Sequence, residues 1–117
     1  MTILFVENHM RFANITAQTF LAAHLVTIVS HISEAKRLLS QNVFDVVLVD
    51  YDLDDGKGVE LVRWLRERSV RSCIFAVSVH DEGNAALAQA GADAVCSKSN
   101  FKNIEKMIWQ NCGRKSH

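Results

Sequence analysis

Short apolar runs alternate with longer amphipathic stretches from one end of the chain to the other. Five runs rich in branched aliphatic residues predict β-strands, at residues 3–6, 25–29, 46–49, 74–77 and 94–96. The run at 46–49 reads Val-Val-Leu-Val and has no polar position. A strand of this kind is covered on both faces, which is typical of a parallel strand inside an α/β sheet.

The stretches between these strands carry apolar residues at helical spacing. Five stripes indicate helices: Phe12, Ile15 and Phe20; Ile32, Ala35, Leu38 and Leu39; Leu61, Val62 and Leu65; residues 85–90; and Phe101, Ile104, Met107 and Ile108. Ser33-Glu34 is predicted to cap the second helix and Asn100 the last, while Gly91 is predicted to end the fourth. The alternation predicts an α/β fold, a five-stranded parallel sheet with five helices in a doubly wound, flavodoxin-like three-layer arrangement.

Composition narrows the class of protein. The 117 residues suffice for one domain, and they are 49% hydrophobic and 22% charged with a formal net charge of zero. Without an excess of Lys and Arg, we expect no direct nucleic-acid binding. No apolar run is long enough to span a membrane, and the first residues lack the features of a signal peptide.

The chain has three cysteines, Cys73, Cys96 and Cys112. They are odd in number and widely spaced, so they fit neither a disulfide framework nor a paired zinc motif. We therefore expect no disulfide. A cytoplasmic protein is indicated, because reducing compartments keep cysteines unpaired.

Polar residues able to do chemistry stand at the ends of the predicted strands. They are Glu7 and Asn8 after the first strand, Asp50 after the third, Ser78 after the fourth and Lys98 after the fifth. Parallel strands bring their carboxyl ends to one edge, so these side chains are expected to share a crevice. Closely packed carboxylates need a compensating cation, and Mg²⁺ takes such oxygen ligands. Taken singly, Asp50 can also begin a polar turn, Ser78 can be buried with backbone partners, and Lys98 can be solvated.

In this order, these residues resemble the receiver domain of two-component response regulators. The segments that carry the resemblance are residues 3–9 with Phe12, 44–53, 55–58, 76–78, and 90–94 leading into Lys98. The likeness covers almost the entire chain. It implies that residues 1–117 are a single receiver domain, a signalling module and not an enzyme.

The resemblance implies a role for each residue of the crevice. Asp50 accepts a phosphoryl group from a sensor histidine kinase, a phosphotransfer protein or a small phosphodonor; Ser78 supplies the switch hydroxyl and Lys98 its cationic partner. The implied ligands of Mg²⁺ are Glu7, Asn8, Asp50 and Asp52, the last through its backbone carbonyl. The new charge biases the last helix, strand and loops. The fourth helix, fifth strand and fifth helix form a face for an effector or a homodimer.

Four positions around the crevice depart from the family pattern, and Asp54 replaces a further common proline. Asn8 replaces an aspartate that binds the metal, so Mg²⁺ is expected to bind weakly. Val95 replaces an aromatic residue of the switch, and Val79 replaces a small residue and is expected to crowd the entry to the crevice. Ser99 replaces a proline that often follows a cis bond, so a trans peptide bond is expected there.

Two other functions stay open on the residues alone. The four departures favour a receiver-like interaction module that works without phosphorylation. Asp50-Tyr51-Asp52 is also an Asp-x-Asp sequence after a strand, as in phosphohydrolases of the haloacid dehalogenase type, although the later acidic motif of those enzymes is missing. His9 and His80 either orient a hydrolytic water over the crevice or lie exposed on its rim.

Overall fold

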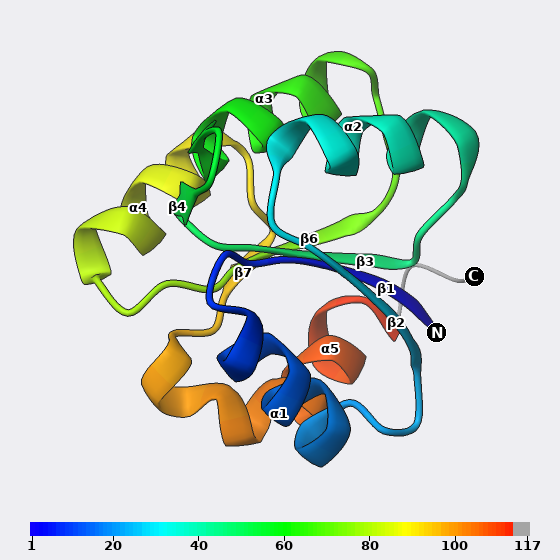
Figure 1. Ribbon diagram of the computed structural model, residues 1–117, viewed down its shortest axis with the longest axis vertical. Coiled ribbons are helices and arrows are strands. Elements are labelled where there is room, and N and C mark those ends of the chain that lie inside the picture. Colours follow the sequence, from blue (N-terminus) through cyan, green and yellow to red (C-terminus); the bar gives the residue numbers. More distant parts are fainter. Residues whose placement is uncertain (114–117) are drawn as a thin grey trace.

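The predicted strands pair into one sheet whose order is β2-β1-β3-β6-β7 (Figure 1). The structure, a computed structural model, describes residues 1–113. Its strands are β1 (Thr2–Val6), β2 (Leu25–Val29), β3 (Val46–Val49), β6 (Cys73–Ala76) and β7 (Ala94–Val95). All pairings in this sheet are parallel, which confirms the predicted fold class. The strand order reverses between β1 and β3, so a crevice opens at their carboxyl ends.

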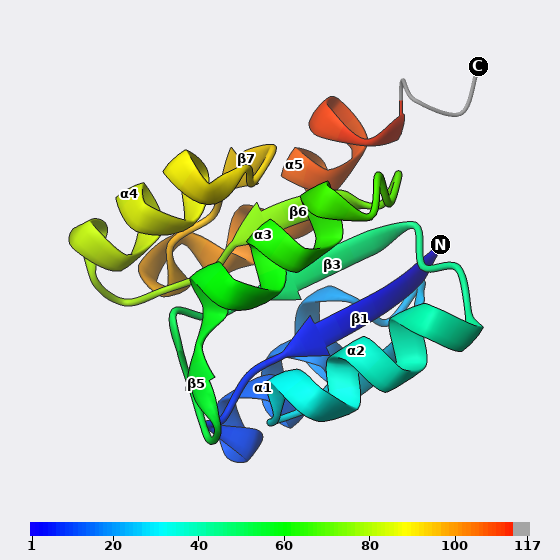
Figure 2. The ribbon, with the colours of Figure 1, turned by 90° about the horizontal axis from the view of Figure 1, so that it is seen from above.

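Helices cover both faces of the sheet and give the molecule three layers (Figures 1 and 2). One face carries α2 (Ile32–Gln41), α3 (Gly58–Glu67) and α4 (Asp81–Ala90). The other face carries α1 (Met10–Phe20) and α5 (Ile104–Asn111). Within residues 1–113, none of the helices has the length and apolar character that crossing a membrane requires.

Successive residues of the central strands feed two separate cores. In β1, Leu4 and Val6 pack in the core under α2 and α3, whereas Ile3 and Phe5 pack in the core over α1 and α5. All four side chains are fully buried. Because side chains alternate between the faces of a strand and both faces are covered, every fully buried position in these strands is apolar.

Two residues of the stripe predicted for helix α1, Phe12 and Phe20, pack against the core, but Ile15 does not. Ile15 is 52% exposed, whereas Ala13 and Thr16 are buried. The Thr16 hydroxyl donates a 2.6 Å hydrogen bond to the carbonyl oxygen of Phe12. The prediction for Ile15 was wrong because a threonine whose hydroxyl bonds within its own helix packs well in an apolar layer.

A short antiparallel hairpin of β4 (Asp52–Leu53) and β5 (Gly56–Lys57) follows β3 and was not predicted. Its Asp55 carboxylate accepts hydrogen bonds from the backbone N–H groups of Ile32 (2.6 Å) and Ser33 (3.1 Å). Although desolvation acts to raise it, these hydrogen bonds hold the pKa of Asp55 below its usual value. The hairpin therefore caps α2, and the predicted cap at Ser33 was wrong because Ser33 lies inside the helix.

The last two helices also begin elsewhere than predicted. Helix α4 begins at Asp81, where early carboxylates suit the positive end of the helix dipole. Gly91 ends α4 with φ 126°, as predicted. Residues before α5 form a 3₁₀-helix, η1 (Lys98–Asn103), so Asn100 lies inside η1 and does not cap an α-helix.

Cys73 and Cys112 form a disulfide, with Cα atoms 5.7 Å apart. This contradicts the expectation of no disulfide. The two cysteines are 39 residues apart in the chain, and they meet only because the end of α5 packs beside the start of β6. Cys96 is free and buried, and burial raises the pKa of its thiol to about 11, so it stays protonated near neutral pH.

Candidate functional site

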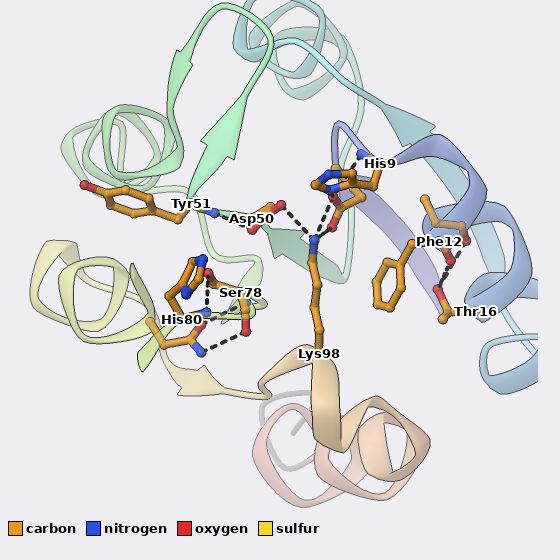
Figure 3. A network of polar contacts seen from close by, with 11 residues as sticks. His9, Phe12, Thr16, Asp50, Tyr51, Ser78, His80 and Lys98 are labelled. Carbon is orange, nitrogen blue, oxygen red and sulfur yellow. Dashed lines mark hydrogen bonds and ion pairs between the residues drawn. The ribbon is translucent and has the colours of Figure 1, made fainter. Parts of the chain in front are cut away.

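Three charged side chains meet at the carboxyl edge of the sheet (Figure 3). Lys98 Nζ lies 3.0 Å from Asp50 Oδ2. The same nitrogen lies 2.9 Å from Glu7 Oε1 and 3.0 Å from Glu7 Oε2. Glu7 directly follows β1, Asp50 follows β3, and Lys98 opens η1 beyond β7. The strand ends thus bring together three of the five residues that the sequence analysis placed in one crevice.

These charges lie largely out of water. The side chains are 9% exposed for Lys98, 6% for Asp50 and 0% for Glu7. Burial raises the pKa of Glu7, while the Lys98 ammonium and the backbone N–H of His9 act to lower it. A buried carboxylate without a partner carries a large desolvation penalty. Lys98 is therefore the cation that compensates both carboxylates.

Packing as well as charge holds Lys98. Its backbone N–H donates to the Ser78 carbonyl oxygen at 3.1 Å. Its Nζ lies 4.9 Å from the centre of the Phe12 ring, which is within range of a cation–π interaction. Phe12 in turn packs edge-on against Phe5 and Phe101. Sequence analysis assigned Phe12 to the core of its helix and did not predict this contact with Lys98.

Backbone contacts position Asp50. Its N–H donates to the Val6 carbonyl oxygen at 3.0 Å, and its Oδ1 accepts the N–H of Tyr51 at 2.8 Å. Gly58, the first residue of α3, packs directly on the Asp50 carbonyl. A Cβ at this position would overlap the carbonyl oxygen and lie 2.9 Å from Val49 Cγ1. The glycine allows α3 to begin against the end of β3.

Ser78 follows β6 at the same edge of the sheet, but its hydroxyl forms no hydrogen bond with Asp50 or with Lys98 Nζ. The Asn84 side chain brackets its backbone: Oδ1 accepts the Ser78 N–H at 2.9 Å, and Nδ2 donates to the Ser78 carbonyl oxygen at 3.1 Å. The Ser78 hydroxyl accepts the His80 N–H at 3.2 Å (Figure 3). Sequence reasoning missed Asn84, because a buried asparagine in a helix has the same spacing as an exposed one.

The acidic residues and their neighbours form a candidate metal site. Asn8 directly follows Glu7, and its Oδ1 is buried without a hydrogen-bond partner. Unsatisfied buried oxygens are costly unless a donor or a cation completes them. The residues therefore fit Mg²⁺, which prefers oxygen ligands. The Asp52 carboxylate pairs with Lys57 Nζ and lies exposed, so only its backbone carbonyl stays a predicted ligand.

The other departures from the receiver pattern leave the fold intact. Val79 and Val95 are exposed. The described residues contain no cis peptide bond, so the bond between Lys98 and Ser99 is trans, as predicted.

Comparison with known families gives one match. The family model described as the response regulator receiver domain matches residues 3–108. Among curated proteins, none matches the sequence significantly.

Solved structures share the fold at low sequence identity. A CheY-like response regulator receiver domain protein from Methanospirillum hungatei is 22% identical, has a TM-score of 0.86 and covers 98% of this chain and 95% of its own. A response regulator of Thermotoga maritima, in complex with Mg²⁺-BeF, is 17% identical with a TM-score of 0.83, covering 93% and 96%. The receiver domain of a sensor histidine kinase from Pseudomonas aeruginosa, with magnesium in its active-site cleft, is 21% identical with a TM-score of 0.81, covering 96% and 97%.

Proposed function

The chain belongs to the response regulator receiver domain family, and on this premise we propose that Asp50 accepts a phosphoryl group. The observation that carries the proposal is the buried placement of Lys98 between Glu7 and Asp50. A cation held 3.0 Å from the acceptor carboxylate stands where a phosphoryl group would add negative charge. Receiver domains are signalling modules, and we propose that this one relays the change to a partner or an output domain and does not act as a turnover enzyme.

The chemistry is a displacement at phosphorus. One Asp50 oxygen forms a bond to phosphorus, while the bond from phosphorus to the donor nitrogen or oxygen breaks and the donor keeps the electron pair. Positioning and charge stabilisation dominate such transfers. The Lys98 ammonium neutralises charge on the phosphoryl oxygens, and the Tyr51 N–H orients the Asp50 carboxylate.

Glu7, Asn8, Asp50 and the backbone carbonyl of Asp52 would hold Mg²⁺. When bound, the ion neutralises part of the charge on the phosphoryl oxygens. The neutral amide of Asn8 makes this a weak Mg²⁺ site, because one of the usual negative charges is missing. The unpartnered Asn8 Oδ1 supports a role in binding a cation.

The response to phosphorylation is proposed to run through Ser78 and the backbone. The Ser78 hydroxyl accepts the N–H of His80, and its own hydrogen is left to donate to a phosphoryl group on Asp50. Val95 offers no aromatic ring to move with it, so the change passes through the loops and helices that follow. The proposed output face comprises α4, β7 and α5, where an effector or a second copy docks, and the proposed donor is a sensor histidine kinase or a phosphotransfer protein.

Asp50→Asn is expected to abolish phosphoryl incorporation, because the amide is not a nucleophile toward phosphorus. Intact mass measured after incubation with acetyl phosphate and Mg²⁺ should show one added phosphoryl group in the wild type and none in the variant. Asp52→Asn is the matched control and should still gain the group, since the Asp52 carboxylate pairs with Lys57 outside the crevice.

The same assay separates the alternatives. If the wild type gains no phosphoryl group, the interaction module that works without phosphorylation is the remaining function. The departures at Asn8 and Val95 favour it. Sustained multiple turnovers of a phosphate ester would instead support a phosphohydrolase. A phosphohydrolase of this type would need the second carboxylate of the Asp-x-Asp sequence in the crevice. In the structure, the Asp52 carboxylate pairs with Lys57 instead.

We propose a cytoplasmic location on family membership, since the Cys73–Cys112 disulfide removes the argument from unpaired cysteines. Disulfides are rare in the cytosol. Cys73 and Cys112 are therefore expected to be thiols in the cell and to pair on oxidation after lysis. Alkylation before lysis, followed by mass spectrometry, checks this; a fully oxidised pair at that stage contradicts the cytoplasmic location.

A further inference from the structure

A histidine follows the neutral Asn8 and borders the same crevice (Figure 3). His9 Nδ1 lies 3.3 Å from Glu7 Oε2, and the His9 backbone N–H donates to that oxygen at 3.0 Å. Ligand atoms of Glu7, His9 and Asp50 all lie within 4.8 Å of one another. Across residues 1–113, this is the one group of three His, Cys, Asp or Glu side chains placed so closely.

We propose that His9 is a metal ligand, and that the site beside Asp50 prefers a first-row transition ion such as Co²⁺ or Zn²⁺ over Mg²⁺. Imidazole nitrogen is a good ligand for these ions, whereas Mg²⁺ selects oxygen. The inference rests on the proposed metal site but not on phosphoryl transfer.

The charge of the site supports this preference. Glu7 and Asp50 supply two carboxylates, Asn8 supplies a neutral amide oxygen, and Lys98 already offsets part of the negative charge. Mg²⁺ binds mainly by electrostatic attraction to hard oxygen ligands, so it loses most from the missing carboxylate. A transition ion recovers affinity through a bond to the neutral imidazole.

The geometry lets His9 reach an ion. Its side chain is 69% exposed, so it rotates without disturbing the core. Ligands of one ion at about 2.0–2.2 Å lie no more than about 4.4 Å apart. His9 Nδ1 and Glu7 Oε2, at 3.3 Å, already lie within this range, and the whole group lies within 4.8 Å. Asn8, which stands between Glu7 and His9 in the chain, also has a buried Oδ1 that no hydrogen bond satisfies.

The test compares Co²⁺ and Mg²⁺ binding in untagged wild type and His9→Gln. Titration calorimetry gives the affinities, and the visible absorption of Co²⁺ reports its ligands. His9→Gln should weaken Co²⁺ binding about tenfold or more and change the Co²⁺ spectrum, while Mg²⁺ affinity changes less than about twofold. Circular dichroism checks that the variant is folded.

Two histidine variants are matched controls. His80 lies on the rim outside the ligand group, and His31 lies 3.2 Å from Glu34 on the surface, where it offers an alternative imidazole–carboxylate site. His80→Gln and His31→Gln should both keep wild-type Co²⁺ affinity. Asn8→Asp should strengthen Mg²⁺ binding, which shows that the assay detects this site.

Each other outcome overturns the inference. Unchanged Co²⁺ affinity and spectrum in folded His9→Gln exclude His9 as a ligand but leave a Mg²⁺ site in place. Equal affinity of the wild type for Co²⁺ and Mg²⁺ removes the preference. Absence of binding by either ion removes the metal site as well, whereas the phosphoryl-acceptor role of Asp50 is decided separately by its own variant.

Discussion

Replacing Lys98 with methionine is expected to lower the free energy of unfolding by about 3–5 kcal/mol near neutral pH. The substitution keeps an unbranched side chain of similar length and removes the ammonium. Glu7 and Asp50 then face each other in a buried site without a cation. Breaking a buried ion pair from one side is costly because the remaining charges keep their desolvation penalty. Urea denaturation of both proteins measures the difference.

The loss should depend on pH. Burial raises the pKa of Glu7, and removing Lys98 removes a contact that opposes the rise, so this pKa increases further. A carboxyl whose pKa is raised on folding contributes stability that is fully present below its unfolded pKa and is lost as pH rises through the folded value. Lys98→Met should therefore approach the wild type at about pH 4 and differ most at about pH 7.5.

The same variant should lose function. Phosphoryl incorporation from acetyl phosphate is expected to fall about 100-fold, because a buried charge partner of the transferred group is gone. Lys102→Met is the matched control: Lys102 is an exposed lysine in the same 3₁₀-helix and should be neutral in both assays. Equal stability of the two variants across the pH range would show that the buried charge network does not compensate the carboxylates.

Gly58→Ala is expected to destabilise the protein by about 3 kcal/mol or more, although alanine favours a helix by about 1 kcal/mol over glycine. The new methyl would overlap the backbone carbonyl of Asp50, and no side-chain rotation relieves that contact. Helix α3 would have to move away from the end of β3. Thermal and urea unfolding should show the loss, and phosphoryl incorporation at Asp50 should fall with it.

Gly83→Ala provides the comparison for this prediction. A Cβ at Gly83 would meet side-chain atoms, at 3.0 Å from Ser78 Oγ and 3.0 Å from Tyr51 Cβ, instead of backbone. Small adjustments relieve such contacts, so its stability should stay within about 1 kcal/mol of the wild type. If Gly58→Ala is no more damaging than Gly83→Ala, the close approach of α3 to Asp50 is not a constraint on the fold.

Repeated local patterns made most of the fold predictable. Apolar runs identified the five strands of the sheet within a residue or two, most clearly β3 and β6, where covering on both faces leaves every position apolar. The same patterns predicted five helices. They missed the β4–β5 hairpin, since strands of two residues are too short to show an alternation of apolar and polar positions.

Two errors have the same cause: a residue far away in the chain determined the local structure. Asp55 caps α2 from the hairpin, so Ser33 is not needed as a cap. The end of α5 brings Cys112 to Cys73, so sequence spacing gave no warning of the disulfide. None of these pairs shares a local pattern.

The order of residues along the chain was enough to infer the α/β class, the parallel sheet and the edge at which Glu7, Asp50 and Lys98 meet, because strand ends follow from local apolar runs. The burial and the contacts of the side chains were decided only by the tertiary structure. It buried Lys98 between the two carboxylates and brought Cys112 to Cys73. Side-chain direction and burial depend on which segments pack together, and that information is spread over contacts between residues far apart in the chain.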